Sequence, residues 1–324
     1  PVHWRGALSM ARYLITGGAG FIGSNLAEAL LRQGDDVRVL DDFSSGRRAN
    51  LEQAGGWATA GGGRFELIEG DIREEVTCCE AMREVDYVLH QAAIPSVQRS
   101  VLDPVKTNEV NVGGTLRLLE AAREAKVRRF VSASSSSLYG ESETLPKVES
   151  MAPAPISPYG LQKLAGESYC ALYHRLYGVP TVALRYFNVF GPRQDPGSQY
   201  SAVIPRFITA VKAGKAPTVY GDGEQTRDFT FVANVVEANL AACRAGDEAL
   251  GGAYNIGCGS RISLNDLLRS LGQITGKEIR PEYTEPRAGD IRHSLAGIDL
   301  AGSRLGFRPH VELTEGLRRT LEAY

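Results

Sequence analysis

The sequence predicts an α/β protein with a mainly parallel, doubly wound sheet and a smaller C-terminal α/β region. Short β-type runs alternate with helical stretches over the first two thirds of the chain, which is typical of βαβ units. Small or polar residues follow most of these runs, and ligands of open parallel sheets bind beyond the carboxyl ends of the strands. We therefore expect a ligand site at that edge of the sheet. The runs are Arg12–Thr16, Asp36–Leu40, Phe65–Glu69, Asp86–His90, Arg128–Ala133 and Thr181–Arg185.

Helical patterns lie between these runs. The first begins at Phe21, carries Leu26 and Leu30 on one face, and ends at Gly34. Longer helices are expected at about 107–125 and 158–177. Paired glycines between 55 and 63 indicate a flexible surface excursion instead.

Composition excludes several classes of function. The chain has 324 residues and a formal net charge of -2, so it does not resemble a general nucleic-acid binder. No apolar run reaches the roughly 18–20 residues that span a bilayer, and the first ten residues lack a signal-peptide core. The five cysteines form no CxxC pair and the five histidines are scattered, so we expect no metal site and a reducing, cytoplasmic location.

A glycine motif indicates the cofactor. Gly17, Gly20 and Gly23 lie between the first strand and the first helix, where glycines allow a tight turn and close approach to a pyrophosphate. Asp41 ends the second strand and can accept hydrogen bonds from adenosine ribose hydroxyls, while repelling a 2′-phosphate. The motif predicts a Rossmann-type domain that binds NAD rather than NADP.

Domain boundaries follow from this motif and from a change in composition. After about Asn188 the chain carries Gly and Pro clusters at 191–197 and 213–223. We expect an N-terminal extension at residues 1–10, an NAD-binding Rossmann domain at 11–188, and a substrate-binding region at 189–324. Parts of that last region should return to the Rossmann domain.

A second motif indicates acid–base chemistry. Tyr159 and Lys163 are four residues apart on a predicted helix and therefore share one face. The Lys163 ammonium and an oxidised nicotinamide would lower the pKa of the phenol and make it a usable base. A serine from the run at 134–137 can relay or orient the proton, so the sequence predicts hydride-transfer chemistry at this point.

Together these residues resemble the extended short-chain dehydrogenase/reductase family, specifically its sugar-nucleotide 4-epimerases. The resemblance runs from about residue 11 to 324. It also covers the segments Leu40–Asp42, Gly70–Asp71, His90–Ala93, Asn111–Thr115, Ser134–Gly140, Leu184–Arg193, Gly221–Asp228 and Arg287–Asp290.

The resemblance implies roles for individual residues. The catalytic group would be Tyr159 and Lys163 with Ser135, and with Ser136 able to share the work. The cofactor would contact Gly17, Gly20, Phe21, Ile22, Gly23, Asp41, Ser45, Gly46, Asp71, Ile72, Gln91, Ala92, Ala93, Asn111, Ser134, Tyr159, Lys163 and Tyr186. The UDP-sugar would contact Ser96, Ser135, Asn188, Ala202, Val203, Arg227, Arg287, Asp290 and Ser294, with both arginines on the diphosphate.

The choice among related reactions rests on absent carboxylates. A 4,6-dehydratase of this family would carry Asp-Glu where this chain has Ser136 and Ser137, and decarboxylating relatives usually have Glu at the second position. A serine cannot replace a carboxylate as acid or base at neutral pH. Epimerisation at C4 is therefore favoured; a UDP-glucuronate-type 4-epimerase, a 4,6-dehydratase and a non-catalytic NAD-binding protein are the alternatives.

The resemblance also implies a substrate and an assembly. Ser294 lies where a bulky Tyr would exclude N-acetyl sugars, so the small side chain predicts UDP-GlcNAc/UDP-GalNAc interconversion, with possible UDP-Glc/UDP-Gal activity and a place in polysaccharide biosynthesis. In relatives, helices matching 107–125 and 158–177 form a four-helix dimer interface. We accordingly expect a homodimer.

Overall fold

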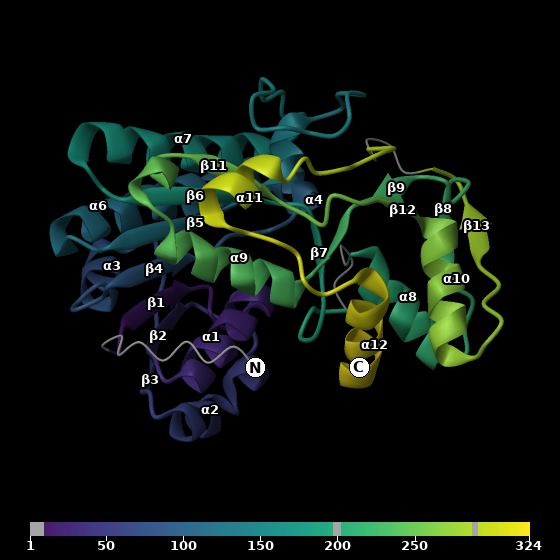
Figure 1. The fold of residues 1–324 in the computed structure, drawn as a ribbon, viewed down its shortest axis with the longest axis horizontal. Helices are drawn as coiled ribbons and strands as arrows, with labels where there is room; N and C mark the ends of the chain where they lie inside the picture. The colour runs from purple at the N-terminus through teal and green to yellow at the C-terminus, as the bar shows by residue number, and fades with distance from the viewer. Residues whose placement is uncertain (1–9, 197–201, 287–290) are drawn as a thin grey trace.

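The computed structural model describes residues 10–196, 202–286 and 291–324 (Figure 1). Of the expected N-terminal extension, residues 1–9 lie outside these ranges, as do Arg287 and Asp290 of the expected substrate site.

A parallel sheet is the centre of the fold. Its strand order is β11-β6-β5-β4-β1-β2-β3, and every pairing within it is parallel. The order reverses beside β1, which creates the crevice where such sheets bind ligands. The Rossmann-type prediction is confirmed. The strands are β1 (Arg12–Thr16), β2 (Asp36–Asp41), β3 (Phe65–Glu69), β4 (Tyr87–His90), β5 (Arg129–Ser135), β6 (Thr181–Tyr186) and β11 (Ala253–Ile256).

Helices cover both faces of this sheet (Figure 1). One apolar core joins the sheet to α1 (Phe21–Gln33), α2 (Ala54–Gly61), α9 (Val232–Arg244) and α11 (Asp299–Leu305). The other joins it to α3 (Glu75–Ala81), α6 (Thr115–Ala125) and α7 (Pro158–Tyr177). Strand β11 and helices α9 and α11 come from beyond residue 188, so the C-terminal part of the chain contributes to the large sheet.

A separate core lies beside the carboxyl ends of the strands. It is built around Phe190, Phe207, Phe231, Leu267 and Leu317, all buried. Its helices are α8 (Val203–Lys212), α10 (Leu264–Thr275) and α12 (Leu313–Ala323), and its short strands are β7 (Asn188–Phe190), β8 (Thr218–Tyr220), β9 (Thr226–Arg227), β10 (Phe229–Phe231), β12 (Ile262–Ser263) and β13 (Glu282–Thr284).

Two segments differ from the sequence-based expectation. The glycine-rich segment 54–61 is a helix, because Ala54, Trp57 and Ala58 bury one face against the core. The helix expected at 107–125 consists of α5 (Pro104–Asn108), a π-helical turn η2 (Glu109–Gly114) and α6. Such π turns occur frequently at functional sites. Helix α4 (Val97–Leu102) and the 3₁₀ turns η1 (Arg48–Leu51), η3 (Ser136–Tyr139) and η4 (Asp247–Ala249) complete the elements.

Candidate active site

A long cleft follows the carboxyl ends of β1, β2, β4, β5 and β6. Its volume is about 640 Å³, which is within the usual size of a ligand site. It brings together nearly all the residues that the sequence assigned to the cofactor. These are Gly17, Gly20, Phe21, Ile22, Gly23, Asp41, Ser45, Gly46, Asp71, Ile72, Gln91, Ala92, Ala93, Ser134, Tyr159, Lys163 and Tyr186.

The turn between β1 and α1 leaves no room for side chains. A Cβ added to Gly17 would lie 2.7 Å from the Ala92 nitrogen, and one on Gly23 would lie 2.2 Å from the Gly17 carbonyl oxygen. Gly17 also has φ +69, a conformation that favours glycine. The backbone therefore lines the cleft directly beside the N-terminus of α1, where a pyrophosphate is stabilised.

Asp41 holds the same turn from the next strand. Its carboxylate accepts hydrogen bonds from the backbone nitrogens of Ala19 (2.8 Å) and Phe43 (2.9 Å). Burial raises the pKa of Asp41, and these backbone bonds oppose the rise. Because a carboxylate offers about four acceptor sites, Asp41 can also accept hydrogen bonds from the hydroxyls of a ribose in the cleft.

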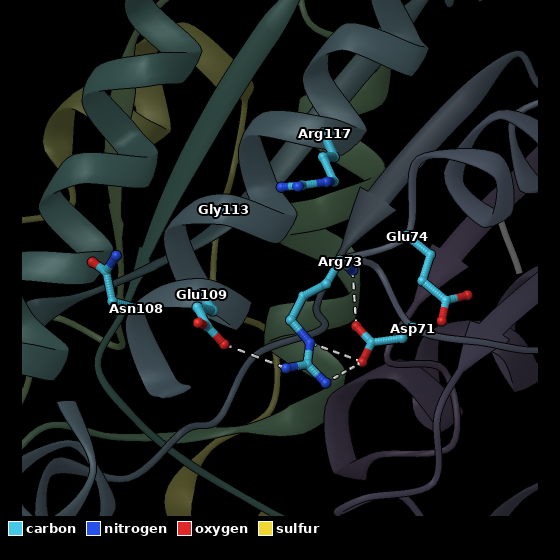
Figure 2. Close-up of a pocket in the computed structure, with 7 residues that line it drawn as sticks. All are labelled: Asp71, Arg73, Glu74, Asn108, Glu109, Gly113 and Arg117. Atoms are coloured by element: carbon cyan, nitrogen blue, oxygen red, sulfur yellow. Dashed lines mark hydrogen bonds and ion pairs between the residues drawn. The ribbon is translucent and has the colours of Figure 1, made fainter. Parts of the chain in front are cut away.

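Asp71 lies at the far end of the cleft with an arginine partner. Figure 2 shows the Arg73 guanidinium between Asp71 and Glu109, with Arg117 on the neighbouring helix. Arg73 Nε and Nη2 donate to one Asp71 oxygen at 2.9 and 2.6 Å. These hydrogen bonds hold the pKa of Asp71 below its usual value. The carboxylate is thus a fixed acceptor at a position that the resemblance assigns to the cofactor.

Tyr159 and Lys163 enter the cleft from the first two turns of α7. Ser157 caps this helix by accepting from the Gly160 nitrogen at 3.1 Å, and Pro158 occupies its first position, as expected at a helix start. The Tyr159 nitrogen donates to Ser100 Oγ at 3.0 Å. Lys163 Nζ lies 5.9 Å from the Tyr159 ring centroid and donates to the Ala133 carbonyl at 2.7 Å. The helix start, α4 and β5 therefore fix both side chains.

Electrostatics at this pair differ from the simplest expectation. Burial raises the pKa of Tyr159 to about 12, and a hydrogen bond from the Ser135 side chain opposes the rise. Burial also lowers the pKa of Lys163 to about 8. Without a bound cofactor, the Tyr159 phenol therefore stays protonated at neutral pH. The lowering of its pKa that positive charge is expected to cause requires the charge of the nicotinamide in addition to that of Lys163.

The serine run at the end of β5 divides into two parts. Ser134 and Ser135 line the cleft, and Ser135 Oγ also accepts from the Ser137 nitrogen at 3.2 Å. Ser136 and Ser137 form the first turn of η3 and are not among the residues lining the cleft. Only Ser135 therefore combines a place in the cleft with a hydrogen bond to Tyr159.

Some of the residues predicted to contact the UDP-sugar line the cleft, and others lie on segments that pair with one another. Ser96 and Ala202 line the cleft. Val203 begins α8 and Asn188 begins β7. Arg227 Nη1 donates to the carbonyls of Thr226 and Arg292 at 3.0 and 3.2 Å, and the Ser294 nitrogen donates to the Thr226 carbonyl at 3.1 Å. Arg227 and Ser294 are thus neighbours on paired backbone segments.

Asn111 lies behind the cleft rather than in it. Its side chain accepts from the Ile94 nitrogen at 2.7 Å and donates to Gln162 Oε1 at 2.9 Å. It is buried in the π-helical turn η2. The structure therefore places this predicted cofactor residue where it links the loop after β4 to α7.

Two buried groups were missed by sequence reasoning. His90 Nδ1 contacts Thr16 Oγ1 at 2.7 Å and its Nε2 contacts Thr115 Oγ1 at 2.9 Å; burial lowers its pKa to about 3, so it stays neutral. Glu167, one turn beyond Lys163, accepts from Ser134 Oγ at 2.8 Å and pairs with buried Arg185 at 2.6 Å. The four-residue spacing from Tyr159 through Lys163 to Glu167 was the available signal for the second group.

Two further features concern metal ligands and membrane-spanning helices. Among residues 10–196, 202–286 and 291–324, no group of three or more His, Cys, Asp or Glu side chains could hold a metal ion. Within the same ranges, none of the helices combines the length and the apolar character needed to cross a membrane.

Comparison with known proteins agrees with this site. The model of the NAD dependent epimerase/dehydratase family matches residues 13–257. A UDP-glucose 4-epimerase of Mycolicibacterium smegmatis is 41% identical over 316 residues, which cover 97% of this chain and 98% of the relative.

Two solved structures are similar over almost their whole length. A UDP-N-acetylglucosamine 4-epimerase from Methanobrevibacter ruminantium, in complex with UDP-N-acetylmuramic acid, has a TM-score of 0.91 and 36% identity, covering 98% of both chains. A UDP-glucuronic acid 4-epimerase from Bacillus cereus, in complex with UDP-glucuronic acid and NAD, has a TM-score of 0.86 and 34% identity, covering 96% of this chain and 98% of that one.

The glycine turn and Asp41 suit the binding of NAD, the Tyr159–Lys163 pair lies in the same cleft, and the family model spans the strands and helices that carry these residues. The chain therefore belongs to the NAD dependent epimerase/dehydratase family, and its cofactor is NAD.

Proposed function

We propose that this enzyme inverts C4 of a UDP-linked hexose through a 4-keto sugar. The observation that supports this most directly is the position of Tyr159, which lies in the cofactor cleft between Ser135 and Lys163. NAD, held by the glycine turn and Asp41, would supply reversible hydride chemistry for C4, so no second substrate would be consumed.

The chain's own residues manage the proton. The Tyr159 phenolate removes the proton of the 4-hydroxyl, and Ser135 donates a hydrogen bond that favours the ionised phenol. Lys163, held by the Ala133 carbonyl, adds positive charge on the same side of the cleft. After the keto sugar turns within the site, Tyr159 returns the proton to the 4-oxygen.

Epimerisation fits better than elimination or decarboxylation. The positions where related dehydratases carry Asp-Glu are Ser136 and Ser137 in η3. Neither side chain can act as a general acid or base at neutral pH. With serines at these two positions the site can oxidise and reduce C4, but the two positions offer no carboxylate to eliminate water at C5 and C6.

We infer UDP-GlcNAc and UDP-GalNAc as the preferred substrates. Ser294 has a small side chain on the segment that pairs with Thr226, which leaves room for a 2-acetamido group. One of the similar solved structures is described as a UDP-N-acetylglucosamine 4-epimerase. A second observation favours uronates as a further class: Arg99 is exposed and lines the cleft one turn after Ser96, where a guanidinium can bind a sugar carboxylate.

The test is turnover of a substrate panel without added NAD. Purified enzyme is incubated separately with UDP-GlcNAc, UDP-Glc and UDP-glucuronate, and C4 inversion is followed by proton NMR. We expect inversion of UDP-GlcNAc, and Ser294→Tyr should reduce its kcat/KM by about 100-fold or more while sparing UDP-Glc, because a bulky ring fills the space beside C2. Turnover of UDP-Glc but not of UDP-GlcNAc by the unaltered enzyme would contradict the substrate assignment.

The same proposal includes a homodimer. Leu161, Leu172 and Leu176 are 58%, 36% and 62% exposed along one face of α7. Val101, Leu102 and Val105 are exposed on the adjacent α4 and α5. An exposed apolar surface of this kind is typical of an interface. The proposed interface therefore lies on α7, α4 and α5, whereas the sequence analysis expects it on the helices at 107–125 and 158–177.

A further inference from the structure

Asp228 is a buried carboxylate where three segments meet, each of which carries a residue predicted to contact the substrate. It lies between β9 and β10, and its side chain is fully excluded from solvent. Arg227 precedes it directly in the chain. No step of the proposed chemistry uses this carboxylate, so its burial calls for another explanation.

Backbone N–H groups from distant parts of the chain surround the carboxylate. One oxygen accepts from the Cys258 nitrogen at 2.8 Å, and the other accepts from the nitrogens of Gly259 (3.0 Å) and Ala296 (3.1 Å). Cys258 and Gly259 follow β11, whereas Ala296 follows Ser294 by two residues. The side chain therefore ties the end of the large sheet to the segment that carries Ser294.

The backbone of Asp228 extends this link. Its carbonyl oxygen accepts a hydrogen bond, at 3.2 Å, from the backbone nitrogen of Asn188, the first residue of β7. Two residues before it, Thr226 pairs with His293 and receives the Ser294 N–H. These bonds connect three residues that are predicted to contact the substrate. Asn188 bonds to Asp228 itself, and Arg227 is the neighbour of Asp228 in the chain. Ser294 lies two residues before Ala296, which donates to the Asp228 carboxylate.

Charge makes this junction strong. Burial raises the pKa of Asp228 to about 6, while the three backbone hydrogen bonds oppose the rise. The carboxylate is therefore ionised at neutral pH, and hydrogen bonds to a charged, buried acceptor are the stronger kind. Additional space is scarce, because a Cβ on Gly257 would lie 2.9 Å from Asp228 Oδ2.

We propose that Asp228 is a positioning residue that holds Asn188, Arg227 and Ser294 in register, and so sets affinity for the UDP-sugar without taking part in the reaction. This inference rests on the proposed function for the identity of the ligand. The uridine diphosphate part can nevertheless be tested by itself, without any turnover.

The first experiment compares Asp228→Asn with the unaltered enzyme. Asparagine keeps the volume but turns one acceptor oxygen into an NH₂ that faces N–H donors. We expect the KM for UDP-GlcNAc and the Kd for UDP, by calorimetry, to rise about tenfold or more, because hydrogen bonds to a charged, buried acceptor are stronger than those between neutral groups. The kcat should change by less than about threefold, and bound NAD should be unchanged, since the cofactor cleft does not include Asp228.

Asp222→Asn is the matched control. Asp222 also reaches the 291–296 segment, through Arg292 at 2.9 Å, but its side chain is 55% exposed. Exposed ion pairs contribute little to stability, so the KM and Kd of this variant should stay within about twofold. Equal effects of the two substitutions, or a folded Asp228→Asn protein that binds UDP normally, would overturn the proposal.

A measurement on the unaltered chain covers the case in which Asp228→Asn does not fold. Hydrogen exchange of the ligand-free enzyme, measured by mass spectrometry, should show that the backbone amides of residues 258–259 and 296 are protected as well as those of β11. Exchange as fast as in the exposed loop around Thr144 would show that the junction does not form in solution and would overturn the proposal. If UDP binding depends on Asp228 yet no UDP-sugar is inverted, the proposed function fails while this inference stands.

Discussion

At the Tyr159 hydroxyl, burial and a hydrogen bond from Ser135 act in opposite directions. Burial raises the pKa to about 12, which favours the neutral phenol. The same burial lowers the pKa of Lys163 to about 8, so the ammonium is destabilised in the folded protein. At neutral pH the charged Lys163 therefore costs stability, whereas Tyr159 is neutral in both the folded and the unfolded chain. Perturbed pKa values of this kind are common at catalytic sites.

The Lys163 shift predicts a dependence of stability on pH. The folded pKa of about 8 is below the usual 10.5, so between these values the unfolded chain binds more protons. Stability should therefore rise with pH across this window. Relative to Lys163→Met, the ligand-free enzyme should gain about 2 kcal/mol in free energy of unfolding between pH 8 and pH 10. Urea titrations at both pH values measure this, and a constant difference between the two proteins would contradict it.

Among the elements, the strands and the longest helix were the most predictable. Five residues of β1 and of β3 and all of α7 follow the predicted bounds, because their patterns agree with the caps and turns that flank them. Helix α2 could not be predicted, since its glycines disfavour a helix and only burial of Trp57 against the core overrides them.

The site residues divide in the same way. Gly17, Asp41 and Tyr159 follow strand ends or begin a helix, so their positions in the cleft could be inferred from order along the chain. Asp228 could not, because its partners are backbone amides 30 to 68 residues away. Nothing in the local sequence marks such a contact.

The βα turn offers a matched pair of glycine substitutions. Gly23→Ala should weaken NAD binding by about tenfold or more, because its Cβ would lie 2.2 Å from the Gly17 oxygen and must displace the turn. Gly56→Ala, in α2 with no atom within 4 Å of the added Cβ, should leave NAD affinity unchanged and stabilise the protein by about 0.5–1 kcal/mol. Cofactor titration by fluorescence and thermal unfolding measure both effects. Equal NAD affinity in the two variants would refute the role assigned to the turn.

For the whole molecule, the proposed dimer interface and the proposed catalytic residues share α7. Its first two turns carry Tyr159 and Lys163, while Leu172 and Leu176 lie exposed towards its other end. A dimer interface on this face would cover the apolar side chains and hold the helix that positions the base.

The double substitution Leu172→Glu/Leu176→Glu should make the enzyme monomeric at micromolar concentration. Burial of each leucine is worth about 1.5–3 kcal/mol, and both subunits lose two of them, so the dimer dissociation constant should rise by more than about 100-fold. Val76→Glu, at a more exposed position on α3 (70%), is the control and should remain dimeric. Sedimentation velocity distinguishes these results, and an unchanged dimer in the double variant would exclude this face.

The central claim is that the Tyr159 hydroxyl moves the proton at the sugar 4-oxygen. Its most direct test is the rate of C4 inversion of a UDP-hexose by Tyr159→Phe, followed by NMR and compared with the unaltered enzyme at equal NAD content. We predict a fall in kcat of about 100-fold to 10,000-fold, the range for loss of a general base, with NAD still bound. Inversion at an undiminished rate would contradict the account.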